Sequence, residues 1–490
     1  MISNLFSILL NKKNSTIALF AVCLIFIVLN SYYLILHSFV ISAIPFAIIF
    51  ILAFLLPLDK LFLITVFFTP LSLNISEIVN KHISPDLSIP TEPYLAAILF
   101  IIFLKALSGF KFDPKFIQHP ITVVVILSLI WIGITAITST IPVVSFKFLL
   151  ARLWFVIPIY FLGNTILNQP EKIERFIWLY TIPFVLVIGY TLYQHSQYNF
   201  AERPANWVVK PFYNDHTSYG AILAMYIPVF CGFLFMQEKT RKFKLYAGTA
   251  LIIFIVATIF SYTRASWVSL AAAIAMGIVL RLKIPFKTIF TLLVVGLISF
   301  FTYREMIVNK LEKNNVQSSD NLTEHVQSIS NISSDASNKE RINRWNCAIR
   351  MFQKKPIFGY GPGTYSFQYA PFQLRHERTI ISTDHGDGGN AHSEFLGPLA
   401  ESGIFGILSF SALFIYTLGI SMNLYYKLTE EKNTRILVSV LLLGLITYYI
   451  HGCMNNFLDT DKASIPFWGF TTAIVALDLR YKAKQKAQLT

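Results

Sequence analysis

The sequence predicts an all-α polytopic membrane protein with about 12–14 transmembrane helices and one large extracytoplasmic loop. Two observations predict this class. The chain has 490 residues, of which 55% are hydrophobic and only 13% charged, whereas soluble domains carry about 25% charged residues. Apolar runs of roughly 20 residues recur along the chain, which is the length that a helix needs to cross a bilayer. Backbone polar groups must be paired internally in lipid, so the spans are expected to be helical.

The apolar runs also predict the domain organisation. The spans are expected near 16–37, 39–57, 60–77, 93–109, 120–138, 147–167, 173–193, 216–236, 244–262, 265–282, 286–303, 394–424, 434–455 and 464–480. They predict an N-terminal transmembrane bundle over 1–303, an extracytoplasmic loop domain over 304–393 and C-terminal transmembrane helices over 394–490.

The formal net charge of +14 does not indicate nucleic-acid binding, because the basic loops that orient a membrane protein explain it. Lys and Arg gather in alternate short connections, and such loops face the cytoplasm. The basic connections are 11–14, 109–116, 168–175, 237–244, 281–287, 426–435 and the tail. Both termini are therefore expected in the cytoplasm, and segments 78–92, 194–215 and 304–393 on the opposite side. The four cysteines show no metal-ligand spacing, and no cofactor is expected.

The long loop has two parts of different character. Residues 312–340 are polar and poor in apolar side chains, so we expect them to be mobile. The following stretch places Ile342, Trp345, Ile349 and Phe352 at helical spacing. It predicts an amphipathic helix on the outer membrane surface that ends before Pro356.

Cationic and imidazole side chains cluster at the predicted outer membrane boundary. Charged groups are expensive in lipid and usually face a cavity or a partner. Any one of these residues could be a long cation that extends to the membrane surface, or a histidine that caps a helix. Neither explanation accounts for a cluster on the side of the membrane whose loops are less basic. These residues are Arg152, Arg203, Lys210, His216, Arg264 and His392.

Such a cluster suits an anionic substrate with a phosphate-like leaving group. The planar fork of arginine matches phosphate oxygens, and a neutral histidine accepts a proton from an attacking hydroxyl. We therefore predict that Arg264, with Arg152, Arg203 and Lys210, holds a departing phosphate, and that His392 is the general base. The supporting residues are predicted to be His216, Arg341, Arg344, Asn390 and Glu401. Glu401 is expected to face the interior, either paired with a cation or as a neutral acid.

Two other motifs have simpler interpretations. Gly359, Gly361 and Gly363 lack the spacing and the lysine of a phosphate-binding loop, so they predict tight turns that pack the loop on the membrane. The segment 376–389 holds His376, Asp384, His385 and Asp387, but without metal-ligand spacing it is better explained as a polar loop.

Four elements in order resemble the O-antigen ligase and polymerase superfamily. They are "KPFYNDHTSYGAILAM", "SYTRASW", "RWNCAIRMFQKKPIFGYGPGTY" and "NAHSEFLGPLAESGIFG", and together they cover roughly residues 200–425. The resemblance implies a metal-independent GT-C-type glycosyltransferase of the bacterial inner membrane. The family's essential histidine falls on His392 and an essential arginine on Arg264. A second cation falls on Lys210 or Arg203, where the sequence departs from the family pattern.

The resemblance implies that a glycan moves from a polyprenyl (undecaprenyl) diphosphate carrier to an acceptor hydroxyl at the periplasmic face. The acceptor is lipid A–core in ligases, a carrier-linked glycan in polymerases, and Ser or Thr in protein O-oligosaccharyltransferases. A ligase is the narrowly favoured interpretation. A flippase for lipid-linked sugars is the alternative of another class, but it needs polar groups near the midplane. The expected partners are this donor, an acceptor glycan and the bilayer, and no nucleic acid.

Overall fold

The structure is a computed structural model that describes residues 24, 26–32, 52, 54–76, 87–303, 336–379, 382 and 389–489. The chain forms two compact units, residues 1–61 and 62–490. The second unit holds the helical bundle and every candidate residue. The predicted spans 16–37 and 39–57 lie largely outside the described residues.

Eight helices in the described part of the chain are long and apolar enough to cross a membrane. They are α8 (Pro120–Ile137), α9 with its continuation (Pro142–Ile166), α11 (Pro170–Ser196), α13 (His216–Phe235), α14 (Arg241–Phe260), α15 (Arg264–Arg281), α21 (Leu396–Lys427) and α22 (Lys432–Gly452). These helices confirm an all-α polytopic membrane protein. Four more helices overlap predicted spans: the short α4 (Leu58–Phe68), α6 (Thr91–Leu107), α16 (Phe286–Thr302) and the partly charged α23 (Asp461–Leu489).

Several short elements and the 19-residue helix α19 connect or extend these helices. They are α4 (Leu58–Phe68), the 3-10 turn η1 (Thr69–Leu71), α7 (Pro114–Ile117), the π-helical turn η2 (Ile157–Leu162), α10 (Gly163–Ile166), α12 (Ala205–Val208), α19 (Ala336–Lys354), α20 (Tyr365–Gln368), η3 (Ala370–Phe372) and η4 (Arg375–Glu377). The strands β1 (Leu73–Asn74) and β2 (Ser88–Ile89) pair antiparallel, with Leu73 opposite Ile89.

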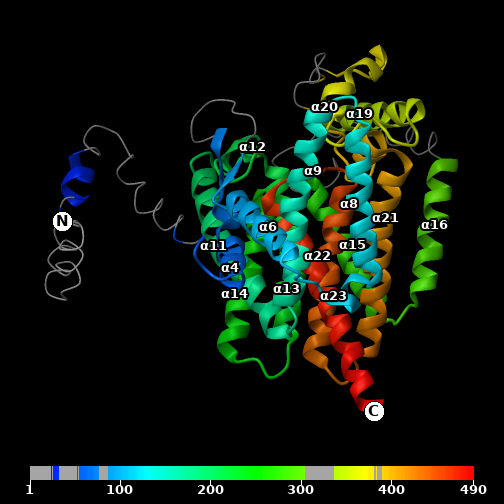
Figure 1. Cartoon of the computed structure of the whole chain (residues 1–490). Coiled ribbons are helices and arrows are strands. Elements are labelled where there is room, and N and C mark those ends of the chain that lie inside the picture. Colours follow the sequence, from blue (N-terminus) through cyan, green and yellow to red (C-terminus); the bar gives the residue numbers. More distant parts are fainter. Residues whose placement is uncertain are drawn as a thin grey trace, which may run out of the picture. The chain divides into compact units, whose positions relative to one another are not determined.

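The basic connections gather at one end of the bundle. Hydrogen bonds join them to one another, pairing Lys239 with Glu174, Gln237 with Asn433, Tyr426 with Ile284, and Lys484 with Glu431. α12, α19 and α20 lie at the opposite end from the C-terminus (Figure 1). Among the described residues, the basic connections 168–175, 237–244, 281–287 and 426–435 and the tail therefore share one end of the bundle.

α21 is broken near its start, and the glycine-rich segment fills the break. Gly403 has φ +67° and ψ −158°, which interrupts the helix. Three backbone hydrogen bonds then join the two segments: Tyr360 N–H to the Ala400 carbonyl (3.1 Å), Gly361 N–H to that of Glu401 (2.8 Å), and Ile404 N–H to that of Pro356 (2.9 Å). The break exposes backbone groups of α21 that an intact helix would have used internally.

The prediction of tight turns at Gly359, Gly361 and Gly363 is confirmed. All three have positive φ, +65°, +112° and +74°, a region that glycine adopts without a steric penalty. α8 holds the assembly from the other side, because Trp131 Nε1–H donates to the Ser402 carbonyl at 2.8 Å and the Trp131 ring stacks on Phe358.

α19 forms where the amphipathic helix was predicted and ends at Lys354, but a different face is buried. Its buried residues are Glu340, Asn343, Arg344, Cys347, Ala348 and Met351, whereas the predicted apolar face of Ile342, Trp345, Ile349 and Phe352 is only half-buried. The reason is tertiary: α19 packs on α21 and on Tyr360, Tyr365 and Tyr369. Residues 336–340, at the end of the segment expected to be mobile, belong to α19, and 312–335 lie outside the described residues.

We expect Gly403→Ala to destabilise the protein by about 1–3 kcal/mol or more, because alanine is strained at this φ and its Cβ would collide with the Ile357 carbonyl oxygen. The matched control is Gly189→Ala inside α11, where a Cβ meets no atom within 4 Å. It should be neutral or stabilising. Thermal unfolding in detergent measures both, and equal melting temperatures would contradict the strained break.

Candidate functional site

His392 lies in a strained turn directly before α21. Its φ of +47° is in the left-handed region, which few non-glycine residues adopt and in which histidine is enriched. The His392 N–H donates to Asn390 Oδ1 at 3.0 Å, and its carbonyl accepts from Trp345 Nε1–H at 3.4 Å. Both sides of the peptide are therefore held while the half-buried imidazole extends from the turn.

Arg344 of α19 holds this turn in place. Its side chain is buried, its Nε–H donates to Glu340 at 2.8 Å, and an Nη1–H donates to the Asn390 carbonyl at 3.2 Å. A Cβ on Gly389 would collide with the guanidinium. Arg344 thus supports the site by positioning the chain at 389–390.

Glu340, the carboxylate partner of Arg344, is itself held by several donors. Its second oxygen accepts from Thr379 Oγ1 at 2.8 Å and from the Ser382 hydroxyl. Burial acts to raise the pKa of Glu340, but the donors Ser382, Arg344 and Thr379 lower it overall. Glu340 therefore stays ionised and balances the buried arginine.

The surroundings of His392 keep its imidazole neutral. Burial, followed by the positive charges of Arg344 and Arg341, lowers the pKa of His392 to about 4, against the opposing effect of Asp215 and Glu340. At pH 7 the ring therefore has an unprotonated nitrogen that can accept a proton.

Three imidazoles from separate segments share the same charged neighbours. Arg341 and Asp215 lie within electrostatic range of His392, of His216 and of His451, which is buried at the end of α22. The predicted residues His216, Arg341 and His392 are thus brought together by the fold.

Arg264 begins α15 beside this group. The neighbouring Thr263 Oγ1 donates to the His216 carbonyl at 3.0 Å, and His216 Nδ1 lies 2.8 Å from the Ser261 carbonyl oxygen. These contacts fasten the start of α15 to the start of α13. Arg264 is half-buried there, at a helix N-terminus where backbone N–H groups and the helix dipole favour an anion.

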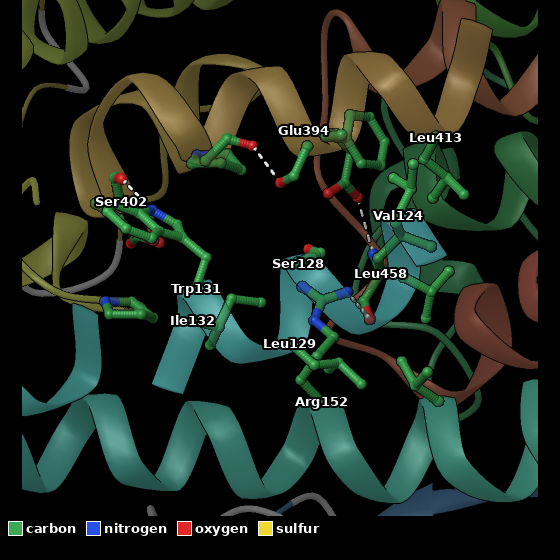
Figure 2. Close-up of a pocket in the computed structure, with 18 of the residues that line it drawn as sticks. Val124, Ser128, Leu129, Trp131, Ile132, Arg152, Glu394, Ser402, Leu413 and Leu458 are labelled. Carbon is green, nitrogen blue, oxygen red and sulfur yellow. Dashed lines mark hydrogen bonds between the residues drawn. The ribbon is translucent and has the colours of Figure 1, made fainter. Parts of the chain in front are cut away.

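Arg152 is engaged differently from the prediction. Its guanidinium forms an ion pair with Asp459 at 2.7 Å, and Phe148 lies under it at 5.2 Å. It lines a mostly apolar pocket of about 80 Å³ between α8, α9 and α21, with Glu394 and Glu401 (Figure 2). Since a carboxylate already neutralises Arg152, it is a weaker candidate for diphosphate binding than Arg264.

The two glutamates of this pocket bind backbone amides. Glu401 Oε1 accepts from the Tyr365 N–H at 3.0 Å, so the carboxyl holds the start of α20. Glu394 Oε1 accepts from Tyr448 Oη at 2.7 Å and from the N–H groups of Phe457 and Leu458 at 2.8 and 2.9 Å. Glu394 thereby ties the loop after α22 to the chain beside His392.

The remaining predicted residues lie farther out. Arg203 and Lys210 are exposed on either side of α12. His376 lies in η4, while Asp384, His385 and Asp387 fall outside the described residues. Within the described ranges no three His, Cys, Asp or Glu side chains converge on a metal position.

Sequence reasoning missed Asp215, Glu340, Glu394 and His451. Glu394 had a usable signal, because it stands two residues after His392 at the predicted edge of a span. No signal in the sequence pointed to His451, because one histidine at the end of an apolar helix is more often a buried residue with its hydrogen bonds made. Its place beside Asp215 and Arg341 depends on packing between helices distant in sequence.

These features define a helical, multi-pass membrane protein whose ionisable groups converge at one end of the bundle. Over residues 249–411 the chain matches the O-antigen ligase family (Wzy_C), which confirms the family predicted from the sequence. No curated protein matches the chain. The matched region includes Arg264, Arg341, Arg344, His392 and Glu401, whereas Arg152, Arg203, Lys210 and His216 precede it.

The low pKa of His392 predicts a pH-dependent stability. Between pH 6.5, its usual value, and about 4, the unfolded chain binds a proton that the folded chain does not. The contribution of His392 to the free energy of unfolding is therefore complete above pH 6.5. It falls as the pH falls towards 4, by at most about 3 kcal/mol. His392→Asn, which tolerates the positive φ, should lose this part of the slope when melting temperature is compared at pH 7 and 4.5.

The matched control for that measurement is His376→Asn, which removes an exposed imidazole of the same outer segment. It should keep the wild-type slope. If His392→Asn also keeps the wild-type change of melting temperature with pH, the imidazole of His392 takes up its proton in the folded protein as readily as in the unfolded chain.

Proposed function

We propose that this protein is a membrane glycosyltransferase that moves a glycan from a polyprenyl diphosphate carrier to an acceptor hydroxyl. One observation supports the proposal: burial and the charges of Arg344 and Arg341 lower the pKa of His392, which lies inside the region that matches the O-antigen ligase family. A base surrounded by cations fits a reaction in which a hydroxyl is deprotonated and a dianionic group departs.

In the proposed step the acceptor oxygen attacks the anomeric carbon of the donor sugar. The new C–O bond forms as the bond between that carbon and the diphosphate oxygen breaks, and the leaving group keeps the bonding electrons. His392 accepts the hydroxyl proton. The positive φ and the two backbone hydrogen bonds of His392 support this role, because they fix the direction of the ring.

The leaving diphosphate is assigned to Arg264 and the N-terminus of α15. Arg264 is supported there by the helix dipole and by its place beside His216. Arg341 is the stronger second cation, since its charge reaches the imidazoles of both His216 and His392. Arg203 and Lys210, both exposed, are assigned to the approach of the anionic carrier.

The acceptor is proposed to be lipid A–core, which makes the protein an O-antigen ligase of the bacterial inner membrane. The basic end of the bundle then faces the cytoplasm and the His392 end faces the periplasm. A polymerase would instead use a second carrier-linked glycan, and a protein O-oligosaccharyltransferase would use Ser or Thr. Transfer by purified protein in detergent, without two compartments, separates all three from a flippase.

His392→Ala should abolish glycan transfer while the protein still inserts and keeps its fold, because the acceptor hydroxyl loses its base. Purified variant, carrier-linked glycan and acceptor are combined, and product is followed on a gel. The control is His376→Ala in η4, which should keep wild-type transfer. Near-normal product from His392→Ala would exclude this imidazole as the base.

Arg264→Lys should reduce kcat/KM for transfer by about tenfold or more, because an ammonium replaces a planar fork that binds two phosphate oxygens. Arg281→Lys is the matched control, since Arg281 is exposed at the other end of the same helix. It should leave kcat/KM unchanged. Equal activity of the two variants would remove Arg264 from the diphosphate site.

A further inference from the structure

An apolar groove of about 720 Å³ lies between α14 and α15. Both helices pack on α13, and residues of α13 and α22 form the floor of the groove. The lining residues Cys231, Phe235 and Ile274 are exposed, so the groove opens sideways at the surface of the bundle. All four helices are long and apolar enough to cross a membrane, which means that this opening faces lipid.

The lining of the groove is suited to hydrocarbon. Its two hydroxyl groups are already bonded within their own helices, Thr258 to the Phe254 carbonyl at 2.8 Å and Ser439 to the Ile436 carbonyl at 2.7 Å. Most of the other lining side chains are aliphatic. A hydrocarbon chain in the groove gains dispersion contacts, whereas a sugar or a phosphate would lose its hydrogen bonds to water without replacement.

The groove is deepest in the half of the bundle next to the basic connections. α13 lines it with residues from 227–235 and α22 with residues from 439–443, and these segments lie in the halves of the two helices nearest the basic end. Towards the other end the groove reaches Trp267, beyond which the turn 261–263 joins α14 to α15. The groove is therefore accessible from the leaflet at the basic end, and His392 is not among its lining residues.

Lysine side chains lie at the same end and in line with the groove. Lys244 precedes the lining residue Leu251 by seven residues, which is close to two helical turns, so both face the same side of α14. Lys432 precedes Ser439 of α22 by the same interval. Neither α14 nor α15 contains an Asp or Glu that would oppose an anion.

Hydrogen bonds hold together the two segments that carry these lysines. The Gln237 N–H donates to Asn433 Oδ1, and Asn433 Nδ2–H donates to the Gln237 carbonyl, both at 2.7 Å. This reciprocal pair fastens the connection between α13 and α14 to the start of α22. Basic pockets between spanning helices bind the headgroups of anionic lipids in this way.

We propose that this groove holds an acyl chain of an anionic phospholipid from the leaflet at the basic end, with the phosphate of the lipid at Lys244 and Lys432. The site goes beyond the proposed function, because it lies away from His392 and takes a lipid that is not a substrate. An anionic headgroup is favoured over a zwitterionic one, because it carries no cation that the two lysines would repel. The bound chain fills the space that the hairpin of α14 and α15 leaves open.

The first test measures lipid binding and needs no glycan. Delipidated full-length protein in detergent is mixed with equal amounts of dioleoyl phosphatidylglycerol and dioleoyl phosphatidylcholine, and native mass spectrometry measures the bound lipids. We expect phosphatidylglycerol to be retained with about a tenfold preference, because each basic residue near a membrane surface attracts an anionic headgroup. Equal retention of the two lipids would overturn the choice of headgroup, and no retained lipid would overturn the site.

A variant that fills the groove tests its position. A Cβ at Gly277 meets only Leu443, at 3.8 Å, so Gly277→Leu extends into the groove without a collision at its Cβ. This variant should no longer retain phosphatidylglycerol. The matched control is Gly189→Leu on α11, where a Cβ meets no atom within 4 Å, and it should bind the lipid as the wild type does. Equal retention by the two variants would place the lipid elsewhere.

Lys244→Gln tests the charge and leaves the groove open, so it stays informative if Gly277→Leu does not fold. The preference for phosphatidylglycerol over phosphatidylcholine should fall several-fold. The matched control is Lys242→Gln, because Lys242 is exposed and lies nine residues from Leu251, on the opposite face of α14. An unchanged preference in Lys244→Gln would contradict the assignment of the phosphate.

Photocrosslinking distinguishes this lipid from the polyprenyl carrier. Phosphatidylglycerol with a diazirine in its acyl chain is irradiated with the wild-type protein, and the adducts are mapped by peptide mass spectrometry. We expect adducts within 227–235 and 270–277, which line the groove, and an equal amount of undecaprenyl phosphate should leave them in place. Adducts only outside these segments would overturn the site, and their loss to undecaprenyl phosphate would assign the groove to the carrier instead.

Discussion

The buried ion pair of Arg344 with Glu340 is the interaction on which the site depends. A buried charge pair is stable only when its remaining hydrogen-bonding capacity is satisfied. Here Glu340 also binds Thr379 and Ser382, and Arg344 binds the Asn390 carbonyl. The pair thus links α19 to the outer segment and to the turn of His392. It also places a permanent positive charge beside the imidazole, which helps to keep the ring neutral.

A second constraint is the break in α21. Gly403 ends the helical path, and the freed backbone groups pair with the segment 356–361. α19 and the aromatic residues that follow it are thereby held against the membrane bundle. The same break directs Glu401 towards the start of α20, and Glu394 binds the loop after α22. Both carboxyl groups, that of the predicted Glu401 and that of Glu394, which the sequence did not single out, accept hydrogen bonds from backbone amides.

The two ends of the bundle differ in how their charged side chains are arranged. Basic connections and their acidic partners gather at one end, where Lys239 meets Glu174 and Lys484 meets Glu431. At the other end cations, imidazoles and carboxylates interleave: Arg152 is neutralised by Asp459, whereas Arg264 and Arg341 lie close to the histidines. Beside α15 the positive charge of Arg264 and the helix N-terminus favour an anion.

The sequence by itself determined the helical membrane class, the basic loops and the glycine turns, because these depend on local hydropathy, charge and φ preference. The resemblance to the O-antigen ligase family came from four motifs in order along the chain. The sequence also placed His216, Arg264 and His392 at one boundary. The tertiary structure alone decided which face of α19 is buried, that Arg152 has a carboxylate partner, and that Asp215 and His451 join the site. Those outcomes depend on contacts between residues far apart in the chain, which no local pattern records.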